Sequence, residues 1–322
     1  MTVKHFHLEY NKPKGQDAYS PGDVLTGRVI VVTTKETKVQ CFYVRAKGKA
    51  KVTWCEGAGR KTVVEQNKRK YFYFEHIILQ DKNKGDGSEI IGAGRNVFPF
   101  TFNIPTKDMP SSYQGKWGRI TYSLRAQITQ SIWIVHKTKI EFPFRTKAEY
   151  PFASKTETIL IGLKEQQQAT WISFCGVGKV TMNVTSERMG IKQGEAMGVS
   201  VEVINDSSRT VTPTLYLCQK QTFVAHSKHM VYADNTLVGM GDTVSPQSSH
   251  TVTKVLSIPP LLPPTFFNCS MMKLEYRLKV TLDATQERNF EIKLPLIILL
   301  GSPKQPQQKP KRSIWFRKLI GY

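Results

Sequence analysis

The chain has 322 residues, with 46 lysines and arginines against 25 aspartates and glutamates, which gives a formal net charge of +21 and a pI near 9.7. This length suffices for about two folded domains of roughly 150 residues each. The longest late apolar run, Leu294–Leu300, contains a proline and is too short to cross a bilayer. The N-terminus has no apolar signal core, so we expect neither a membrane span nor a secretory leader.

The first strands follow from alternating apolar residues near the N-terminus. Phe6, Leu8 and Tyr10 alternate with polar residues, as expected of a strand with one buried face. A turn at Gly22-Asp23 then leads into an aliphatic strand that runs to Val32. Both segments predict that the chain begins as an all-β domain.

The segment from Val44 to Trp54 predicts a strand with one basic face. Its even-numbered residues are apolar or small, whereas its odd-numbered residues are four cations and a threonine: Arg45, Lys47, Lys49, Lys51 and Thr53. Side chains two residues apart point the same way, so the cations would form a positive stripe about 20 Å long. One interpretation is a solvated face whose like charges prevent edge-to-edge pairing. The other is a docking site for anionic lipid heads or for acidic and phosphorylated partner segments.

A second basic segment, Lys68–Phe74, contains four aromatic residues. Aromatic residues beside lysine and arginine can stack on nucleic-acid bases. We interpret them instead as part of a strand that ends near Leu79, and we expect a loop at Asp81–Gly87.

One succession of segments occurs twice. Two strands end in Ile-Pro, at Pro105 and at Pro259, and the same distance separates each proline from a later tyrosine, Tyr122 or Tyr276. Both tyrosines lie in segments that alternate apolar and polar residues without a break, which predicts strands with one face in a core and one in water.

Each half also opens with a glycine and an acidic residue before a strand, at Gly22-Asp23 and at Gly194-Glu195. A polar stretch, Glu165–Gln168, separates the halves. The expected organisation is a β-sandwich at residues 1–148, a linker at 149–168, a second β-sandwich at 169–301 and a basic, flexible tail at 302–322.

The tail is rich in proline and in cations and has no acidic residue. A short segment that mixes aromatic residues with cations can lie in the interface of an anionic membrane, where each cation contributes about 1 kcal/mol. The candidate membrane-contact residues are Lys311, Arg312, Trp315, Phe316, Arg317 and Lys318. Two alternatives stay open, namely that the tail folds onto the first domain or that it is a disordered end.

Sequence patterns for catalysis and metal binding are lacking. Gly176–Lys179 does not have the spacing of a phosphate-binding loop, and neither His5/His7 nor His226/His229 has the acidic or cysteine partners that a metal site needs. The five cysteines are scattered and odd in number, which favours a reducing compartment over a disulfide framework. We therefore expect a protein that is not an enzyme and holds no metal or cofactor.

In its order of motifs the chain resembles the arrestin domain-containing proteins, or alpha-arrestins, over roughly residues 5 to 300. The motifs that carry the resemblance are Pro21–Asp23, Phe100–Pro105, Gly115–Ala126, Asn205–Arg209 and Leu274–Leu278. The resemblance implies an all-β fold of two tandem arrestin-type, immunoglobulin-like β-sandwiches. It also implies a cytoplasmic adaptor that is recruited to plasma membrane or endosomes, where it binds cytosolic parts of receptors or transporters and links them to endocytosis, sorting or ubiquitination.

The chain departs from the family pattern in two places. Alpha-arrestins typically recruit WW-domain ubiquitin ligases through Pro-Pro-x-Tyr motifs, but the nearest match here, Pro263–Phe266, ends in phenylalanine. One branch binds thioredoxin through a cysteine of the second domain, and residues 238–250 contain none. The competing hypothesis is an electrostatic binder of anionic lipid or nucleic acid, although no nucleic-acid-binding motif supports the latter.

Overall fold

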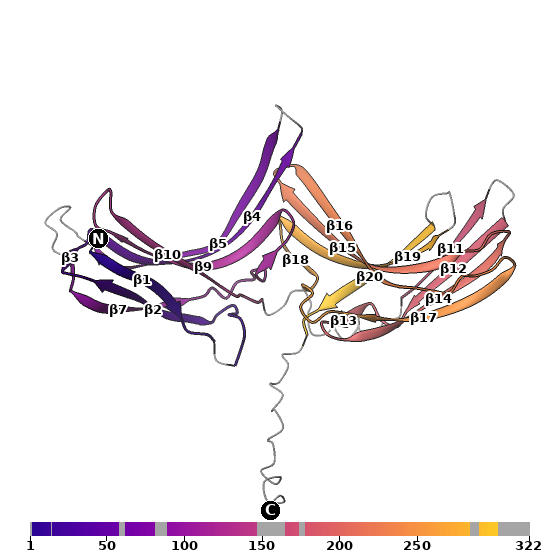
Figure 1. Ribbon diagram of the computed structural model, residues 1–322, viewed down its shortest axis with the longest axis horizontal. Helices are drawn as coiled ribbons and strands as arrows, with labels where there is room; N and C mark the ends of the chain where they lie inside the picture. Colours follow the sequence, from indigo (N-terminus) through magenta and orange to yellow (C-terminus); the bar gives the residue numbers. More distant parts are fainter. Residues whose placement is uncertain are drawn as a thin grey trace, which may run out of the picture.

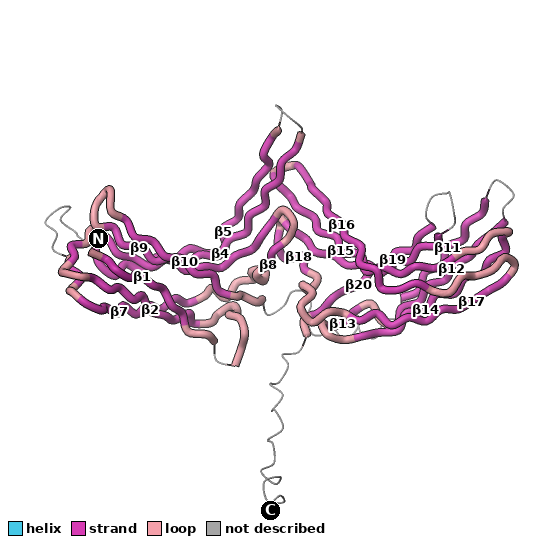
Figure 2. The backbone as a smooth tube through the Cα atoms, in the orientation of Figure 1, coloured by secondary structure: helices cyan, strands magenta, loops and turns pink. Residues whose placement is uncertain are grey.

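The computed structural model describes residues 2–13, 15–57, 62–80, 89–146, 165–173, 178–283 and 290–301, and the ordered elements within these ranges are all β-strands (Figures 1 and 2). The strands of the first half are β1 (Val3–Tyr10), β2 (Val24–Thr33), β3 (Thr37–Lys38), β4 (Cys41–Glu56), β5 (Val63–Gln80), β6 (Ile90–Ile91), β7 (Gly94–Asn103), β8 (Tyr113–Gln114), β9 (Gly118–Thr129) and β10 (Val135–Phe142). Those of the second half are β11 (Glu165–Ser173), β12 (Gly178–Ser186), β13 (Gly190–Lys192), β14 (Ala196–Ser207), β15 (Thr212–Ala225), β16 (Lys228–Met240), β17 (Ser248–Ser257), β18 (Phe266–Cys269), β19 (Met272–Asp283) and β20 (Phe290–Leu299).

Each half is a sandwich of two sheets. In the first, the sheet β1-β2-β7 packs on the sheet β10-β9-β4-β5, to which β8 adds beside β9. In the second, β11-β12-β14-β17 packs on β13-β20-β19-β15-β16, and β18 adds beside β19. The two sandwiches lie side by side along the long axis, and the hairpins β4–β5 and β15–β16 meet at the centre (Figure 1). The expected all-β fold of two tandem sandwiches is confirmed.

The internal repeat is visible in the hydrogen bonds. The Ile104 amide donates to Asp23 O at 2.9 Å, and the Ile258 amide donates to Glu195 O at the same distance. The glycines before these acidic residues, Gly22 and Gly194, both have positive φ, a conformation that glycine adopts without a steric penalty. Each half therefore closes its Ile-Pro strand against the same glycine–acid turn.

The tyrosine strands repeat as well. The buried hydroxyl of Tyr122 donates to Pro110 O at 2.6 Å, and that of Tyr276 donates to Pro263 O at 2.7 Å. Both tyrosines are at most 2% exposed. Each hydroxyl thus ties the loop that follows an Ile-Pro strand to the centre of its sandwich.

The predicted alternation in Val44–Trp54 is confirmed within β4. Val44, Ala46, Ala50 and Val52 are completely buried, while the cations between them are partly exposed. A bulge where Gly48 faces Phe72 and Lys49 faces Lys70 leaves Tyr71 unpaired, so that Tyr71 and Phe72 are both buried. These aromatic residues are strand residues, as expected.

Two expectations need correction. Thr121 and Ser123 of β9, expected to face water, are only 9% and 7% exposed. Their strand lies between β4 and β10, where they are paired with Lys49 and Lys47, and short side chains on an inner strand are shielded more easily than long ones. Glu165–Gln168 was expected in the linker, but strand β11 begins at Glu165 and pairs with β12. Strand pairing uses backbone hydrogen bonds, so a polar segment without apolar side chains can form it. Residues 149–164 lie outside the described ranges.

The two sandwiches share an interface. Trp117 packs edge-on against Phe223 at 5.7 Å and Tyr232 at 5.8 Å, and Tyr113 packs against Phe266 at 4.9 Å. These contacts join the β8–β9 region of the first domain to β15, β16 and β18 of the second. Because aromatic pairs of this geometry add to the effect of area burial, they fix how the domains meet.

Polar contacts surround this aromatic centre. The buried Tyr71 hydroxyl donates to Cys269 Sγ at 3.3 Å, and Arg69 donates to Ser270 Oγ at 2.7 Å. Near the hairpin tips, Lys228 forms ion pairs with Glu56 at 2.8 Å and Glu65 at 2.7 Å.

Candidate anion-binding face

Strand pairing gathers further cations around the basic stripe of β4. Residues directly opposite each other in a sheet share a face, and Lys51 is paired with Arg119 on β9 and Lys68 on β5. Arg125 of β9 is in turn paired with Lys139 of β10. We call this outward side of the sheet β10-β9-β4-β5 the basic face. Its cations are Lys47, Lys49, Lys51, Lys68, Lys70, Arg119, Arg125, Lys137 and Lys139.

Mutual repulsion marks the centre of the basic face. The pKa of Lys49 is lowered, first by partial burial and then by the charges of Lys47, Lys139, Arg119 and Lys51. A bound anion would counter the lowering of the Lys49 pKa by burial and by like charges, because an opposite charge favours the protonated amine. The Thr121 hydroxyl, paired opposite Lys49, is buried and has no hydrogen-bond partner in the described structure. This hydroxyl is therefore unpaired beneath the cations of this face.

Not every predicted cation is available. Arg45 donates to the Glu75 carboxylate at 2.5 Å and lies over the Tyr43 ring at 3.8 Å. Lys139 is paired with Glu141 at 2.6 Å. For Lys47, Lys49 and Lys51, by contrast, no carboxylate of the described residues lies within ion-pair distance. The stripe thus has a neutralised end at Arg45 and an uncompensated end at Lys51.

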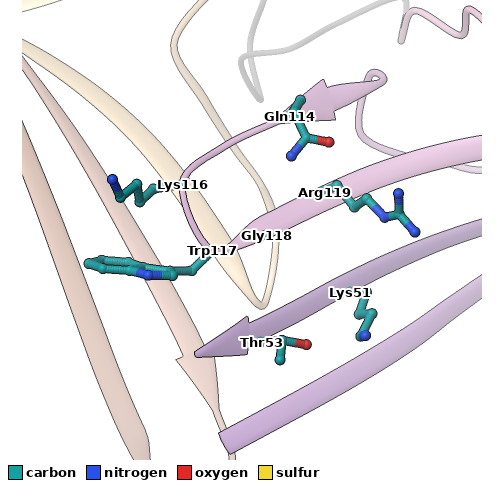
Figure 3. A pocket seen from close by; sticks show the side chains of 7 residues that line it. All are labelled: Lys51, Thr53, Gln114, Lys116, Trp117, Gly118 and Arg119. Carbon is teal, nitrogen blue, oxygen red and sulfur yellow. The ribbon is translucent and has the colours of Figure 1, made fainter. Parts of the chain in front are cut away.

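A pocket of about 290 Å³ opens at this uncompensated end (Figure 3). It is lined by Lys51, Thr53, Gln114, Lys116, Trp117, Gly118 and Arg119. Lys51 and Arg119 lie on adjacent strands along one side, and the β8–β9 turn brings Lys116 and Trp117 to the other (Figure 3). The volume is at the lower end of the range for small-ligand sites, about 300–1,000 Å³. Three cations, an amide and a hydroxyl suit a phosphate or carboxylate group.

The second domain holds the β8–β9 turn in place. The Gly115 amide donates to Gly118 O at 2.8 Å, which closes the turn, and the Lys116 amide donates to Gln221 Oε1 at 2.9 Å. The Lys116 ammonium lies 5.2 Å from the centre of the Tyr232 ring. The shape of the pocket therefore depends on how the two domains pack.

The sequence indicated only part of this site. Arg45, Lys47, Lys49 and Lys51 share one face, as predicted, but Arg119 and Lys116 were singled out only as part of a family motif. The alternating pattern of β9 predicted that Arg125 lies on a polar face, but it did not indicate which strand would lie beside Arg125. The candidate membrane-contact residues of the tail, Lys311, Arg312, Trp315, Phe316, Arg317 and Lys318, lie outside the described residues.

The Pro263–Phe266 segment is part of the domain interface. Thr265 is 2% exposed and Phe266 is 6% exposed, and Phe266 packs against Tyr113. A WW domain requires an exposed proline-rich ligand. This segment is thus not presented in a form that such a domain could bind.

The described residues show no sign of two other kinds of site, a metal centre and a membrane-spanning helix. No group of three or more histidine, cysteine, aspartate or glutamate side chains there is arranged to hold a metal ion. No helix in the same residues is long and apolar enough to cross a membrane. Cys41, Cys55, Cys218 and Cys269 are free thiols.

Two β-sandwiches that meet at an aromatic interface, with a charged surface as the candidate site, are typical of a binding scaffold. The chain belongs to the arrestin domain-containing, or alpha-arrestin, family. Residues 6–145 match the arrestin (or S-antigen) N-terminal domain, and residues 177–305 match the arrestin C-terminal domain. The resemblance noted in the sequence is thereby confirmed. Arrestin-family proteins are generally non-catalytic adaptors.

Relatives from several animals are similar over most of this chain. Human arrestin domain-containing protein 4 is 25% identical over 302 residues, which cover 92% of this chain and 71% of the relative. Arrestin domain-containing protein 17 of Caenorhabditis elegans is 25% identical over 332 residues, covering 96% and 72%. Human thioredoxin-interacting protein is 23% identical over 301 residues, covering 92% and 74%.

Proposed function

We propose that this chain is a non-catalytic adaptor that binds cytosolic segments of membrane proteins and links them to endocytosis or sorting. Acidic or phosphorylated stretches of the cargo lie on the basic face, with one anionic group in the pocket beside Lys51 and Arg119. The adaptor works in the cytoplasm and is recruited to the plasma membrane or endosomes by its cargo. Recruitment of a ubiquitin ligase through Pro263–Phe266 is not part of this role, because Phe266 is buried.

The observation that carries the proposal is the group of uncompensated cations at one end of an open sheet face. Isolated surface lysines are ordinary, but here the pKa of Lys49 is lowered, first by partial burial and then by the charges of the cations around it. Keeping such a cluster costs folding free energy through like-charge repulsion. An anionic partner removes that cost on binding, so the cluster favours association with acidic segments.

The test is binding of a fluorescent acidic peptide, with and without two phosphoserines, measured by anisotropy over a salt series. Charge-assisted hydrogen bonds contribute about 1.5–3 kcal/mol each, so losing two of them in Lys51→Gln with Arg119→Gln should weaken binding of the phosphorylated peptide by at least about 100-fold. Lys4→Gln with Lys38→Gln is the control, because it removes two exposed cations of the same domain away from the basic face. Equal affinity of the site variant and the wild type would refute the proposal.

The same measurement separates cargo binding from general charge attraction. A site of defined geometry prefers the phosphorylated peptide to an unphosphorylated peptide of equal net charge. If a DNA duplex competes as well as the phosphorylated peptide, and both lose affinity with the same steep salt dependence, the chain is an electrostatic binder without the proposed specificity.

A further inference from the structure

The turn between β9 and β10 exposes three consecutive apolar residues at one end of the first domain. Ile132 is 80% exposed, Trp133 is 87% exposed and Ile134 is 47% exposed. Single exposed apolar residues are common on protein surfaces, but three in succession with a tryptophan among them form a patch that favours a partner. We call Ser131–Ile134 the apolar tip.

The apolar tip is held in a fixed shape. The Ser131 hydroxyl accepts hydrogen bonds from the amides of Trp133 at 3.3 Å and Ile134 at 3.2 Å. The Gln130 amide closes the base of the turn by donating to Ile134 O at 2.9 Å. The Gln130 side chain also donates to the Thr2 hydroxyl at 3.2 Å, which ties the base to the N-terminal strand. The backbone thus presents Ile132 and Trp133 outward, away from the core.

Charge on the same hairpin indicates what kind of partner fits. Residues 130–134 contain no acidic side chain, and the two strands below the tip contribute Arg125, Lys137 and Lys139 to the basic face. The tip rises on the side of its sheet that faces away from β1, β2 and β7, which is the side of the basic face (Figure 1). A tryptophan-containing apolar projection flanked by cations is the combination that binds the interface of anionic bilayers.

We infer that the apolar tip inserts into the head-group region of an anionic membrane while Lys137 and its neighbours contact the lipid phosphates. The ligand is a bilayer surface, so the contact is separate from the cargo site beside Lys51 and does not depend on it. It anchors the free end of the first domain and turns the basic face toward the membrane, where cytosolic segments of membrane proteins begin.

Fluorescence of the full chain tests this directly. The W171F/W315F background removes the tryptophan of β11 and that of the tail, while Trp54 is 3% exposed and Trp117 is packed at the domain interface. With vesicles of phosphatidylserine and brominated phosphatidylcholine, insertion of Trp133 should quench the emission, and the additional W133F substitution should abolish most of that quenching. Equal quenching with and without Trp133 would overturn the inference.

Vesicle flotation supplies the second measurement. The double variant Ile132→Ser with Trp133→Ser should reduce binding of the full chain to phosphatidylserine vesicles at least about 10-fold, as expected when two large apolar side chains no longer leave water. Leu261→Ser is the control, because Leu261 is 92% exposed in the connection between β17 and β18. Unchanged flotation of the double variant would overturn the inference, as would flotation that does not depend on anionic lipid. Concentration-dependent dimerisation that is lost in the double variant would also overturn the inference, because a second copy of the chain would then cover the apolar tip.

Discussion

Gly118 lies in the interface between the two domains, and Gly118→Ala should disturb their packing. An added Cβ would lie 2.5 Å from Met272 Sδ, 2.9 Å from Phe223 Cδ1 and 2.9 Å from Val52 Cγ1. Met272 and Phe223 are at most 1% exposed, so neither side chain has free space into which it could move. Overpacking of this kind costs about 1–3 kcal/mol, which corresponds to a decrease in Tm of roughly 2–10 °C.

Calorimetry of the full chain measures this effect. Gly239→Ala is the matched control, because Gly239 lies in strand β16 and the nearest atom to its added Cβ is Lys254 Cδ at 3.9 Å. We expect that control to leave stability unchanged or to raise it by about 0.5–1 kcal/mol. A second expected sign is that Gly118→Ala weakens phosphopeptide binding, because the same turn forms the pocket. Equal melting temperatures for Gly118→Ala and wild type would refute the close contact described for the interface.

Three further predictions concern buried polar groups and charge. Asn205→Ala should destabilise the second domain by about 2–4 kcal/mol in chemical denaturation, because the completely buried side chain donates to three backbone carbonyls and accepts from Ser207, and the substitution removes all of these bonds. Tyr122→Phe and Tyr276→Phe should each cost about 1–2 kcal/mol, since the two hydroxyls make equivalent bonds. Lys228→Met should lower Tm at neutral pH and have no effect near about pH 3, because the pKa of Glu56 is lowered, mainly by its hydrogen bond from Lys228.

The sign of the pH effect follows from that lowered pKa. A carboxylate whose pKa is lower in the folded state stabilises the fold above its ordinary pKa, and the contribution is lost as pH falls through the lowered value. Wild type and Lys228→Met should therefore converge as pH falls through the lowered pKa of Glu56. A difference that persisted at pH 3 would show that Lys228 acts through packing. Strongly unequal costs for Tyr122→Phe and Tyr276→Phe would contradict the structural repeat.

The alternation of side chains made much of the fold predictable. A strand with one buried face must alternate, so Val44–Trp54 and the tyrosine strands could be recognised without knowledge of their neighbours. The repeated Ile-Pro and glycine–acid positions predicted two similar halves, and the structure shows why: they form the same hydrogen bonds in each half. Local pattern sufficed to recognise these features, because the alternation and the Ile-Pro and glycine–acid dipeptides are each visible in residues close in sequence, although their hydrogen bonds join distant segments.

The site was only partly predictable, because it depends on pairing between distant strands. Nothing local to Lys51 indicates that Arg119 lies opposite it, or that Gln221 of the second domain holds the turn that carries Lys116. Arg45 was predicted as a free cation but is paired with Glu75 across the β4–β5 ladder. The apolar tip was overlooked because Ile132 and Trp133 resemble ordinary strand residues until the hairpin places them at a turn.

The most direct test of the adaptor role is capture of membrane proteins by the intact chain. Wild type and the Lys51→Gln, Arg119→Gln variant would be immobilised and exposed to the same detergent-solubilised membranes, with and without phosphatase treatment, and the bound proteins identified by mass spectrometry. The proposed role predicts that wild type enriches a defined set of integral-membrane proteins and that either phosphatase treatment or the variant depletes it. Recovery of the same proteins by wild type and variant would contradict the role assigned to the basic face.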